Sequence, residues 1–401
     1  MRVILNNIKP RNVCGAFVCL SLSVMSGLSH AQISPQPPQQ TPQQLAKPTG
    51  DWTLFTEFDR LIYSESFSIS DILALVDSDD IFGISIDGNE IDGRGFSQGG
   101  SDTFAHNQTL IGARKGAWEI ALLKRRDSYA NYTPDTALLI LANETNIDVP
   151  NGDLDIDLRL NHSKSLGLRL GYQHQIAPSL SVTGRVSGLQ ATQGIEGNIN
   201  GDLSLLDGGI EGQILLDYDF TDDIAFEREF ETSKGYGFSI DAILNWQASD
   251  KIAVEIGAYD LVNRIWFDET VRTEADATTA VVRTVENGIL IVRPALTGQN
   301  FFGSFTQRLR SRVKADIQYD ISDRWQLSQD LFRTGDNYLT QSEAVYSVNS
   351  DLKLGLSYEW VAKAPGVSLN WKWLNFGFST DSLKINSARF AKLHIGLKVP
   401  L

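Results

Sequence analysis

The chain has 401 residues, 42% of them apolar and only 21% charged, and this balance excludes a disordered protein. It carries 49 acidic against 35 basic residues, so its net charge is −14 and we expect no nucleic-acid partner. Both cysteines, Cys14 and Cys19, lie close to the N-terminus, which excludes a disulfide framework in the remainder of the chain.

The N-terminus is typical of a cleaved export signal. Three basic residues, Arg2, Lys9 and Arg11, precede an apolar run, Val13–Met25, and Ser29-His30-Ala31 supplies a small-x-small cleavage site. The run is shorter than the about 20 residues that a membrane-spanning helix needs. We predict a signal peptide over residues 1–31 and a mature protein that begins at Gln32, with an uncleaved anchor as the alternative.

The next segments differ sharply in composition. Residues 32–50 are rich in Pro and Gln and predict a disordered leader. Residues 51–100 have a weaker pattern, and we expect a cap, a plug or a first strand there. Within them Ser70–Val76 predicts a short helix, and the lumen of a barrel is one location for it. Residues 101–401 form the main folded region.

From residue 101 onward the dominant hydrophobic period is two. Apolar and polar residues alternate in Gly235–Gln247 and in Gln307–Ile321, which predicts strands with one apolar and one polar face. A soluble sandwich would bury the apolar face, whereas a transmembrane barrel would turn it towards lipid. These strands reach the 9 to 11 residues that a tilted crossing needs, which favours the membrane barrel.

Loop lengths also alternate. We expect tight turns on one side of the membrane and longer polar connections on the other, as in outer-membrane barrels. The predicted tight turns are Lys115-Gly116, Ile176–Ser179, Ala248–Lys251, Ser322–Arg324 and Lys363–Gly366. Aromatic residues near these turns predict a girdle at the lipid headgroups: Trp118, Tyr172, Trp246, Trp325 and Trp360.

The last residues carry a motif. His394, Gly396, Val399 and Leu401 place a polar residue, a glycine and two apolar residues at alternate positions up to the C-terminus. This pattern resembles the C-terminal assembly signal of Gram-negative outer-membrane β-barrel proteins, which usually end in an aromatic residue where this chain has leucine. The resemblance implies an outer-membrane location, contact with outer-membrane lipid and recognition by the assembly machinery.

Counting strands back from a periplasmic C-terminus predicts an all-β, antiparallel up-and-down transmembrane barrel of about 14 strands, within a range of 12 to 16. The count places strands at about 388–401, 367–379, 344–360, 324–333 and 306–321. The segment 263–305 is long for a loop and predicts a hairpin that reaches above the membrane.

Charged residues define the candidate lumen. At period two, one strand face carries a row of basic residues, and another strand carries acidic residues with one arginine. The basic row is Arg308, Arg310, Arg312 and Lys314, and the second group is Asp153, Asp155, Asp157 and Arg159. Either the two signs pair across strands, or the basic row offers a path to an anionic solute.

No enzyme motif is recognised. The histidines show no metal-binding spacing, and no cofactor is expected. His162 and Ser163 point to opposite faces if both lie on a strand, so they are polar residues rather than a catalytic pair. We expect a passive channel or transporter for small polar or charged solutes. The alternatives are a non-conducting barrel of an envelope complex, a secreted β-sandwich binding protein and an outer-membrane hydrolase.

Overall fold

The computed structural model describes residues 51–75, 93, 95–145, 149–206, 209–223, 228, 230–286 and 289–401, with only the backbone at 74–75, 143–144 and 209 and over 279–296. All of them lie within one compact unit, Gln40–Leu401. The predicted signal peptide and leader, residues 1–31 and 32–50, fall outside the described residues, as does much of 76–94.

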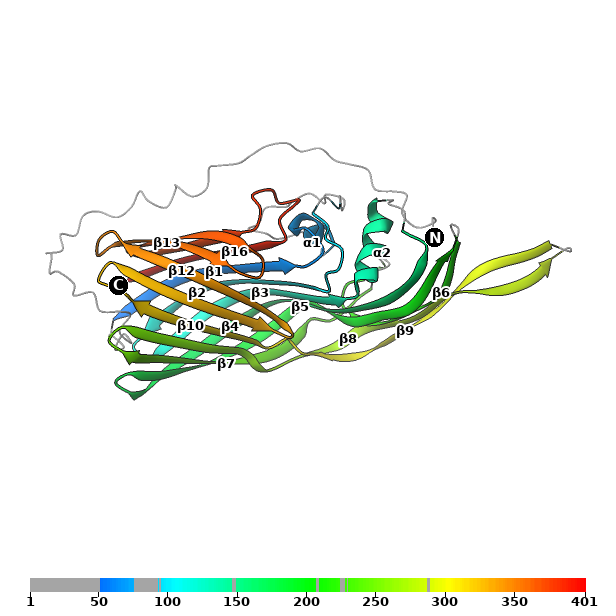
Figure 1. Cartoon of the computed structure of the whole chain (residues 1–401). Coiled ribbons are helices and arrows are strands. Elements are labelled where there is room, and N and C mark those ends of the chain that lie inside the picture. Colours follow the sequence, from blue (N-terminus) through cyan, green and yellow to red (C-terminus); the bar gives the residue numbers. More distant parts are fainter. Residues whose placement is uncertain are drawn as a thin grey trace, which may run out of the picture. The chain divides into compact units, whose positions relative to one another are not determined.

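The described residues form one antiparallel sheet and two helices (Figure 1). The strands are β1 (Trp52–Ser64), β2 (Asp102–Lys115), β3 (Trp118–Tyr132), β4 (Gly152–Ala177), β5 (Leu180–Leu206), β6 (Gly209–Phe220), β7 (Gly235–Ser249), β8 (Ile252–Glu286), β9 (Ile289–Gln307), β10 (Arg312–Asp320), β11 (Trp325–Thr334), β12 (Asn337–Ser347), β13 (Leu352–Glu359), β14 (Ala364–Trp371), β15 (Leu374–Thr380) and β16 (Phe390–Pro400). The helices are α1 (Ile69–Leu75) and α2 (Pro134–Thr145).

Fourteen of the described strands close into a ring. The first and last strands, β1 and β16, pair with each other, as Leu54 opposite Val399 illustrates. Elsewhere each strand pairs with the next along the chain, except that β5 pairs with β7 and β8 pairs with β10. This is the closed antiparallel barrel, with the strand number, that the alternation predicts.

The two remaining described strands, β6 and β9, belong to an extension of the barrel wall. The second half of β5 leaves β7 and pairs with β6, which pairs in turn with the far part of β8, and β9 completes this sheet. Figure 1 shows β6, β8 and β9 running on past the end of the ring. The extension contains the hairpin predicted over 263–305.

The alternation assigns the two faces of the wall. Exposed apolar side chains such as Leu122 and Leu168 share one face, while the side chains between them, among them Arg125 and Arg169, are buried. An apolar face exposed around a closed ring requires lipid, and the polar face then lines the lumen. The chain is therefore an outer-membrane β-barrel.

Both helices lie over the outer face of the wall rather than in the lumen. Ile72 and Leu73 of α1 pack against Ile62, and Ala137 of α2 belongs to the same apolar cluster. Ile62 shares the outward face of β1 with Leu54, so α1 is outside the barrel. The helix forms where Ser70–Val76 predicts one, but not in the lumen. Neither described helix is long and apolar enough to cross a membrane.

Two of the predicted strand positions are wrong. The segment 344–360 contains the end of β12, a turn and β13, and 367–379 contains parts of β14 and β15 joined by a turn. The turn before Ala364 consequently lies at the opposite end of the ring from the turn at Gly116. The reason is strand length: β13, β14 and β15 have only eight, eight and seven residues, and their period-two pattern runs through the turns.

Candidate functional site

The lumen is crossed at mid-height by buried charged groups. Arg125 of β3 donates two hydrogen bonds to Asp260 of β8, at 2.6 and 2.7 Å, and a third to Asp127. Arg312 of β10 donates to the same Asp260 carboxylate at 2.8 Å, and Ser239 of β7 donates at 2.6 Å. One carboxylate thus ties together three walls of the barrel. We call this set of residues, with His106, the luminal charge network.

His106 joins the network to a further wall. Its Nδ1 lies 2.6 Å from Asp127 Oδ1, and its Nε2 lies 2.5 Å from a guanidinium nitrogen of Arg312. Since arginine has only donors, Nε2 must accept, and the ring is neutral with its proton on Nδ1. β2 and β10 lie on opposite sides of the ring, so this contact spans the lumen.

A second ion pair continues the network towards β4. The backbone N–H of Asp260 donates to Asp241 at 2.9 Å, and Asp241 lies 3.7 Å from Arg169. Arg169 also donates to Ser187 and to Gln108, each at 3.3 Å. Charges of both signs are present in equal number among these arginines and aspartates, as burial requires.

A break in strand β8 delivers Asp260 to the lumen. Asp260 has a φ of 56°, and the register between β7 and β8 shifts there, so β8 bulges inward. Beyond the bulge, the side chain of Asn263 takes the place of backbone hydrogen bonds between strands. It accepts from the N–H of Leu309 at 2.7 Å and donates to the carbonyl of Leu309 at 3.0 Å. Bulges commonly redirect a side chain in this way.

Apolar side chains fill the lumen above the network. Phe104 of β2 contacts Phe332 of β11, with ring centroids 5.8 Å apart. Leu339, Tyr129 and Phe390 belong to the same buried cluster. A small cavity remains between this cluster and the network, and its lining includes Tyr129, Phe332 and Arg312.

The predicted basic row is divided by the structure. β10 begins at Arg312, and residues 308–311 have no regular strand structure, so the four side chains do not share one strand face as predicted. Arg312 belongs to the network and Lys314 follows it on the lumen side of β10. Arg310 lies with its guanidinium carbon 3.4 Å from the centre of the Tyr129 ring, and Arg308 is exposed.

The predicted acidic group lies elsewhere. Asp153, Asp155, Asp157 and Arg159 are in the part of β4 that belongs to the extension, on the face continuous with the lumen. Arg159 pairs with Asp157 at 3.4 Å. Of the basic row, Arg312 pairs with a carboxylate outside this group, that of Asp260. Sequence reasoning missed Asp260 because nothing in a period-two pattern marks the bulge. It missed Asp127 and His106 because a contact between strands leaves no pattern within one strand.

The aromatic residues occupy both ends of the ring. Trp118, Tyr172, Trp246 and Trp325 lie at the end with the turn at Gly116, and all are exposed. The rings of Trp118 and Tyr172 are 4.7 Å apart. The position predicted for Trp360 is wrong. Trp360 follows β13 and lies at the opposite end of the ring, because β13 runs antiparallel to β12 where one continuous strand was predicted over 344–360. A role in a girdle stays a prediction.

The C-terminal residues are in the closing strand. His394 of β16 lies 2.6 Å from Asp59 of β1, and Gly396 and Val399 pair with Glu57 and Leu54. The N–H of Leu401 donates to the carbonyl of Trp52 at 2.8 Å. These contacts explain the residues structurally, and recognition by the assembly machinery stays a prediction.

His162 has a serine partner, but it is not Ser163. Ser163 is buried on the lumen side of β4, whereas His162 faces outward and accepts from Ser128 Oγ at 2.7 Å. Its other nitrogen donates to Gln193 at 3.2 Å. Ser128 and His162 are register partners, so this contact joins the outward faces of β3 and β4.

Among the described residues, no group of three or more His, Cys, Asp or Glu side chains is placed to hold a metal ion.

Comparisons with known proteins match at the level of the fold. No family model and no curated protein matches the chain. Among solved structures, the toluene transporter TodX of Pseudomonas putida is 9% identical, with 88% of this chain and 89% of that chain covered and a TM-score of 0.37. The translocator domain of the autotransporter NalP from Neisseria meningitidis is 8% identical (89% and 90% covered, TM-score 0.30).

A Pseudomonas aeruginosa FadL homologue is 9% identical over 87% of this chain and 89% of that chain, with a TM-score of 0.24. None of these three structures is named as an enzyme. The name of TodX concerns a hydrocarbon, whereas the sequence of this chain predicts a polar or charged solute. At such low similarity, the assignment of the barrel depends on the strand pairing of this chain itself.

Proposed function

We propose that the protein is a passive outer-membrane channel for small organic anions that carry an apolar body, such as aromatic carboxylates. The observation that carries this proposal is the position of Arg310. Its guanidinium lies over the Tyr129 ring, and it forms no ion pair with any described residue. A cation held in place without a carboxylate partner is suited to an anionic solute.

The surroundings of Arg310 define the solute further. Phe104, Phe332 and Tyr129 line the same cavity and offer aromatic faces, while Arg312 supplies a second guanidinium. Arginine binds carboxylates through two parallel hydrogen bonds, and aromatic walls favour a flat apolar body. We therefore propose that the small charged solute is amphiphilic, with one anionic group and one apolar part. Uncharged hydrocarbons are the appropriate control solutes in a transport assay.

The luminal charge network supports a gated path rather than a wide pore. The contacts that cross the lumen, Arg125 to Asp260 and His106 to Arg312, are non-covalent. A carboxylate bound at Arg310 lies close to Arg312 along the chain and competes with Asp260 for its guanidinium. Such competition would open the network only while solute passes.

The test is solute entry into proteoliposomes that contain the full mature protein. We expect benzoate to enter faster than glucose, and Arg310→Gln to reduce benzoate entry about tenfold. Arg159→Gln is the matched control, because Arg159 is an exposed arginine of the extension, and it should change nothing. Equal benzoate entry in wild type and Arg310→Gln would contradict the proposal. Faster entry of toluene than of benzoate in both proteins would replace the anion by a hydrocarbon.

A second candidate is a non-conducting barrel of an envelope complex. The specific observation in its favour is that side chains of opposite walls touch, both in the network and between Phe104 and Phe332. Single-channel recording in a planar bilayer distinguishes the two. Folded protein that produces no conductance steps and no solute entry would favour this second candidate.

A further inference from the structure

Charged side chains of three strands meet on the lumen face of the barrel, apart from the luminal charge network. Arg114 of β2 and Glu119 of β3 are register partners, and a guanidinium nitrogen of Arg114 lies 2.5 Å from the Glu119 carboxylate. Arg185 of β5 approaches the same carboxylate at 3.3 and 3.4 Å. Two guanidinium groups therefore share one carboxylate.

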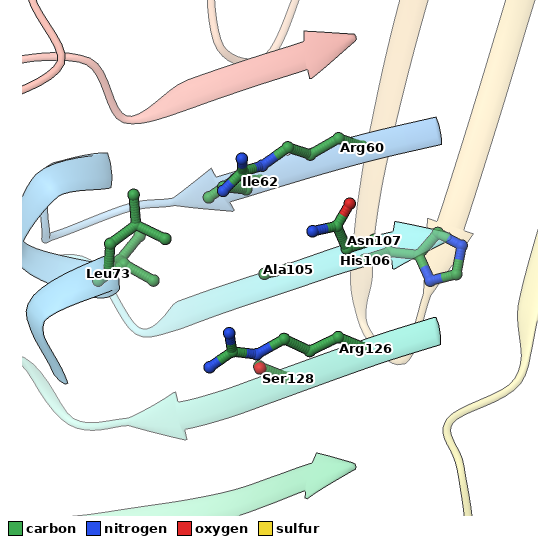
Figure 2. A pocket seen from close by; sticks show the side chains of 9 residues that line it. Arg60, Ile62, Leu73, Ala105, His106, Asn107, Arg126 and Ser128 are labelled. Atoms are coloured by element: carbon green, nitrogen blue, oxygen red, sulfur yellow. The ribbon is translucent and has the colours of Figure 1, made fainter. Parts of the chain in front are cut away.

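Arg114 lies on the lumen side of β2, close to one end of the ring. Figure 2 shows the His106 ring directed away from Leu73 of α1, the helix that covers the outer face. Arg114 is eight residues from His106 along β2, and side chains an even number of residues apart share a face. The C-terminus is at the same end, since the N–H of Leu401 donates to the carbonyl of Trp52, next to Arg114 in the register. Arg114 is therefore near the mouth of the barrel that is predicted to face the periplasm.

Gly171 of β4 makes the contact between Arg185 and Glu119 possible. It is the register partner of both residues and lies between them. A Cβ atom at this position would lie 3.2 Å from Cβ of Glu119 and 3.3 Å from Cγ of Arg185. Glycine thus leaves open the space through which the arginine of β5 crosses β4 to reach the carboxylate of β3.

The carboxylates next to this row have cations of their own. Asp241, the register partner of Arg185, lies 3.7 Å from Arg169. Glu57 of β1 lies 3.5 Å from Lys398 of β16. Because these two pairs are balanced, the row keeps one cation in excess among these residues. It can therefore accept one further anion and become balanced as well.

Arg114 is held in place and is still accessible. Its guanidinium carbon is 5.7 Å from the centre of the Phe55 ring, and Phe55 belongs to a buried apolar cluster with Leu110. An aromatic face attracts a guanidinium without neutralising its charge. The Arg114 side chain keeps 43% of its surface exposed. In both respects it repeats Arg310, which is exposed and lies over the Tyr129 ring.

We propose that Arg114 and Arg185 form a second binding site for the organic anion, from which the anion leaves the lumen. This inference rests on the proposed channel for organic anions. The carboxylate of the solute binds Arg114 through two parallel hydrogen bonds, while Glu119 stays with Arg185. Each guanidinium then has one carboxylate.

The second site is the weaker of the two. The apolar cluster around Phe55 is already buried, so the apolar body of the solute gains fewer contacts there than in the cavity that Phe332 and Tyr129 line. Glu119 also competes with the solute for Arg114. A weaker site near the exit favours release, because conduction requires that a bound solute can leave.

Equilibrium dialysis of radiolabelled benzoate against the full mature protein in detergent tests the proposal. We expect wild type to bind two benzoate molecules per chain, the second about tenfold more weakly than the first. Arg310→Gln and Arg114→Gln should each bind one. Arg324→Gln is the matched control and should bind two, because Arg324 is an exposed arginine in the turn before β11.

Glu119→Gln gives a result that a purely structural role would not produce. Removal of the competing carboxylate should tighten the weaker site about tenfold, and Arg114→Lys should retain part of the binding. Both changes are made in Arg310→Gln, where the second site is expected to be the one that remains. Migration of unheated samples on a gel confirms that each variant is folded.

Two bound benzoate molecules in Arg114→Gln, or binding in Glu119→Gln that is not tighter, would overturn the second site. Benzoate entry into proteoliposomes from the same preparations separates this inference from the channel itself. One bound benzoate in wild type, with entry that depends on Arg310, overturns the second site alone. Neither binding nor entry in wild type contradicts the channel together with this site.

Discussion

At the residue scale, the closure of the lumen depends on Asp260 more than on any other side chain described above. It is fully buried and accepts from Arg125, Arg312 and Ser239. Replacing a buried ion pair as a whole is often harmless, but removing one partner leaves the other buried and uncompensated. Loss of the Asp260 charge would leave two arginines facing each other in the lumen.

We therefore predict that Asp260→Asn lowers the unfolding temperature and loosens the lumen. The expected loss of stability is about 3–5 kcal/mol, because a buried charge pair is broken on one side only. Thermal unfolding in detergent and single-channel recording measure the two effects. Asp351→Asn is the control: Asp351 pairs with Lys372 at 3.8 Å on the surface and should matter little. A wild-type melting curve for Asp260→Asn would contradict the role given to this residue.

The sequence predicts the lumen charges only in part. Arg312 and Lys314 are recognisable because they alternate with Val313 and Ala315, and the structure places both on the lumen side of β10. Arg310 obeys the same period in the sequence and still leaves the strand. The cause is a contact between distant segments, in which the Asn263 side chain binds the backbone of Leu309. A contact between residues so far apart in the chain cannot be predicted from the local sequence pattern.

At the element scale, α1 is held by a capping box and by the apolar contacts of Ile72 and Leu73 with Ile62 of β1. Ser68 Oγ accepts from the N–H of Asp71 at 3.1 Å, and the Asp71 carboxylate accepts from the N–H of Ser68 at 3.3 Å. The sequence predicts a Ser-capped helix over Ser70–Val76, whereas the serine that caps α1 is Ser68. It did not predict that the helix covers lipid-facing strands, because both faces of a barrel accept an apolar helix.

Ser68→Ala should destabilise α1 locally by about 1 kcal/mol, since one helical N–H loses its acceptor. We expect faster hydrogen exchange over 69–75 and unchanged exchange in β3. The barrel itself should melt as wild type does, because α1 is outside the ring. Ser350→Ala serves as the control, since Ser350 is an exposed turn residue. Unchanged exchange over 69–75 would show that the cap is not needed.

The extension has a pH dependence of its own. Burial raises the pKa of Glu196, and the nearby Asp219 carboxylate raises it further. Burial also raises the pKa of Asp219, which is the register partner of Glu196 across β5 and β6. The folded state thus binds protons more tightly than the unfolded state. The charged carboxylates oppose folding fully above the raised pKa values, and this opposition disappears as the pH falls below the ordinary value of about 4.

We therefore expect the pairing of β5 with β6 to weaken as the pH rises through that window. Hydrogen exchange of β6, corrected for its intrinsic pH dependence, measures the effect at pH 4.5 and 7.5. Glu196→Gln should show a smaller difference between the two values, because one of the carboxylates is gone. Asp153→Asn, on the same face of the extension, should behave as wild type. An equal difference in Glu196→Gln and wild type would remove Glu196 as the cause.

At the scale of the whole molecule, the ring of fourteen strands is the feature that the sequence predicts best. A closed membrane barrel needs each strand to present one apolar face, and this requirement produces an apolar residue at every second position of each strand. The ends of the short strands β13, β14 and β15 cannot be recognised in the sequence. Lys363 and Lys372, with φ values of 57° and 50°, occupy turn positions where a glycine would have indicated a turn. Both errors affect the course of the chain but not the closure.

The separation of ring and extension predicts that the tip of the extension can be removed. Thr273 and Asn300 are register partners on β8 and β9, so a two-residue Asn-Gly turn can replace residues 274–299. All fourteen strands of the ring keep their neighbours, and we expect the shortened protein to fold and to resist unfolding on an unheated gel. Removal of β11 alone is the control. It leaves an odd number of strands, two of which would have to pair in parallel, so that variant should fail to fold. If the shortened protein also fails, the extension is required to build the ring, and the two cannot be treated as separate units.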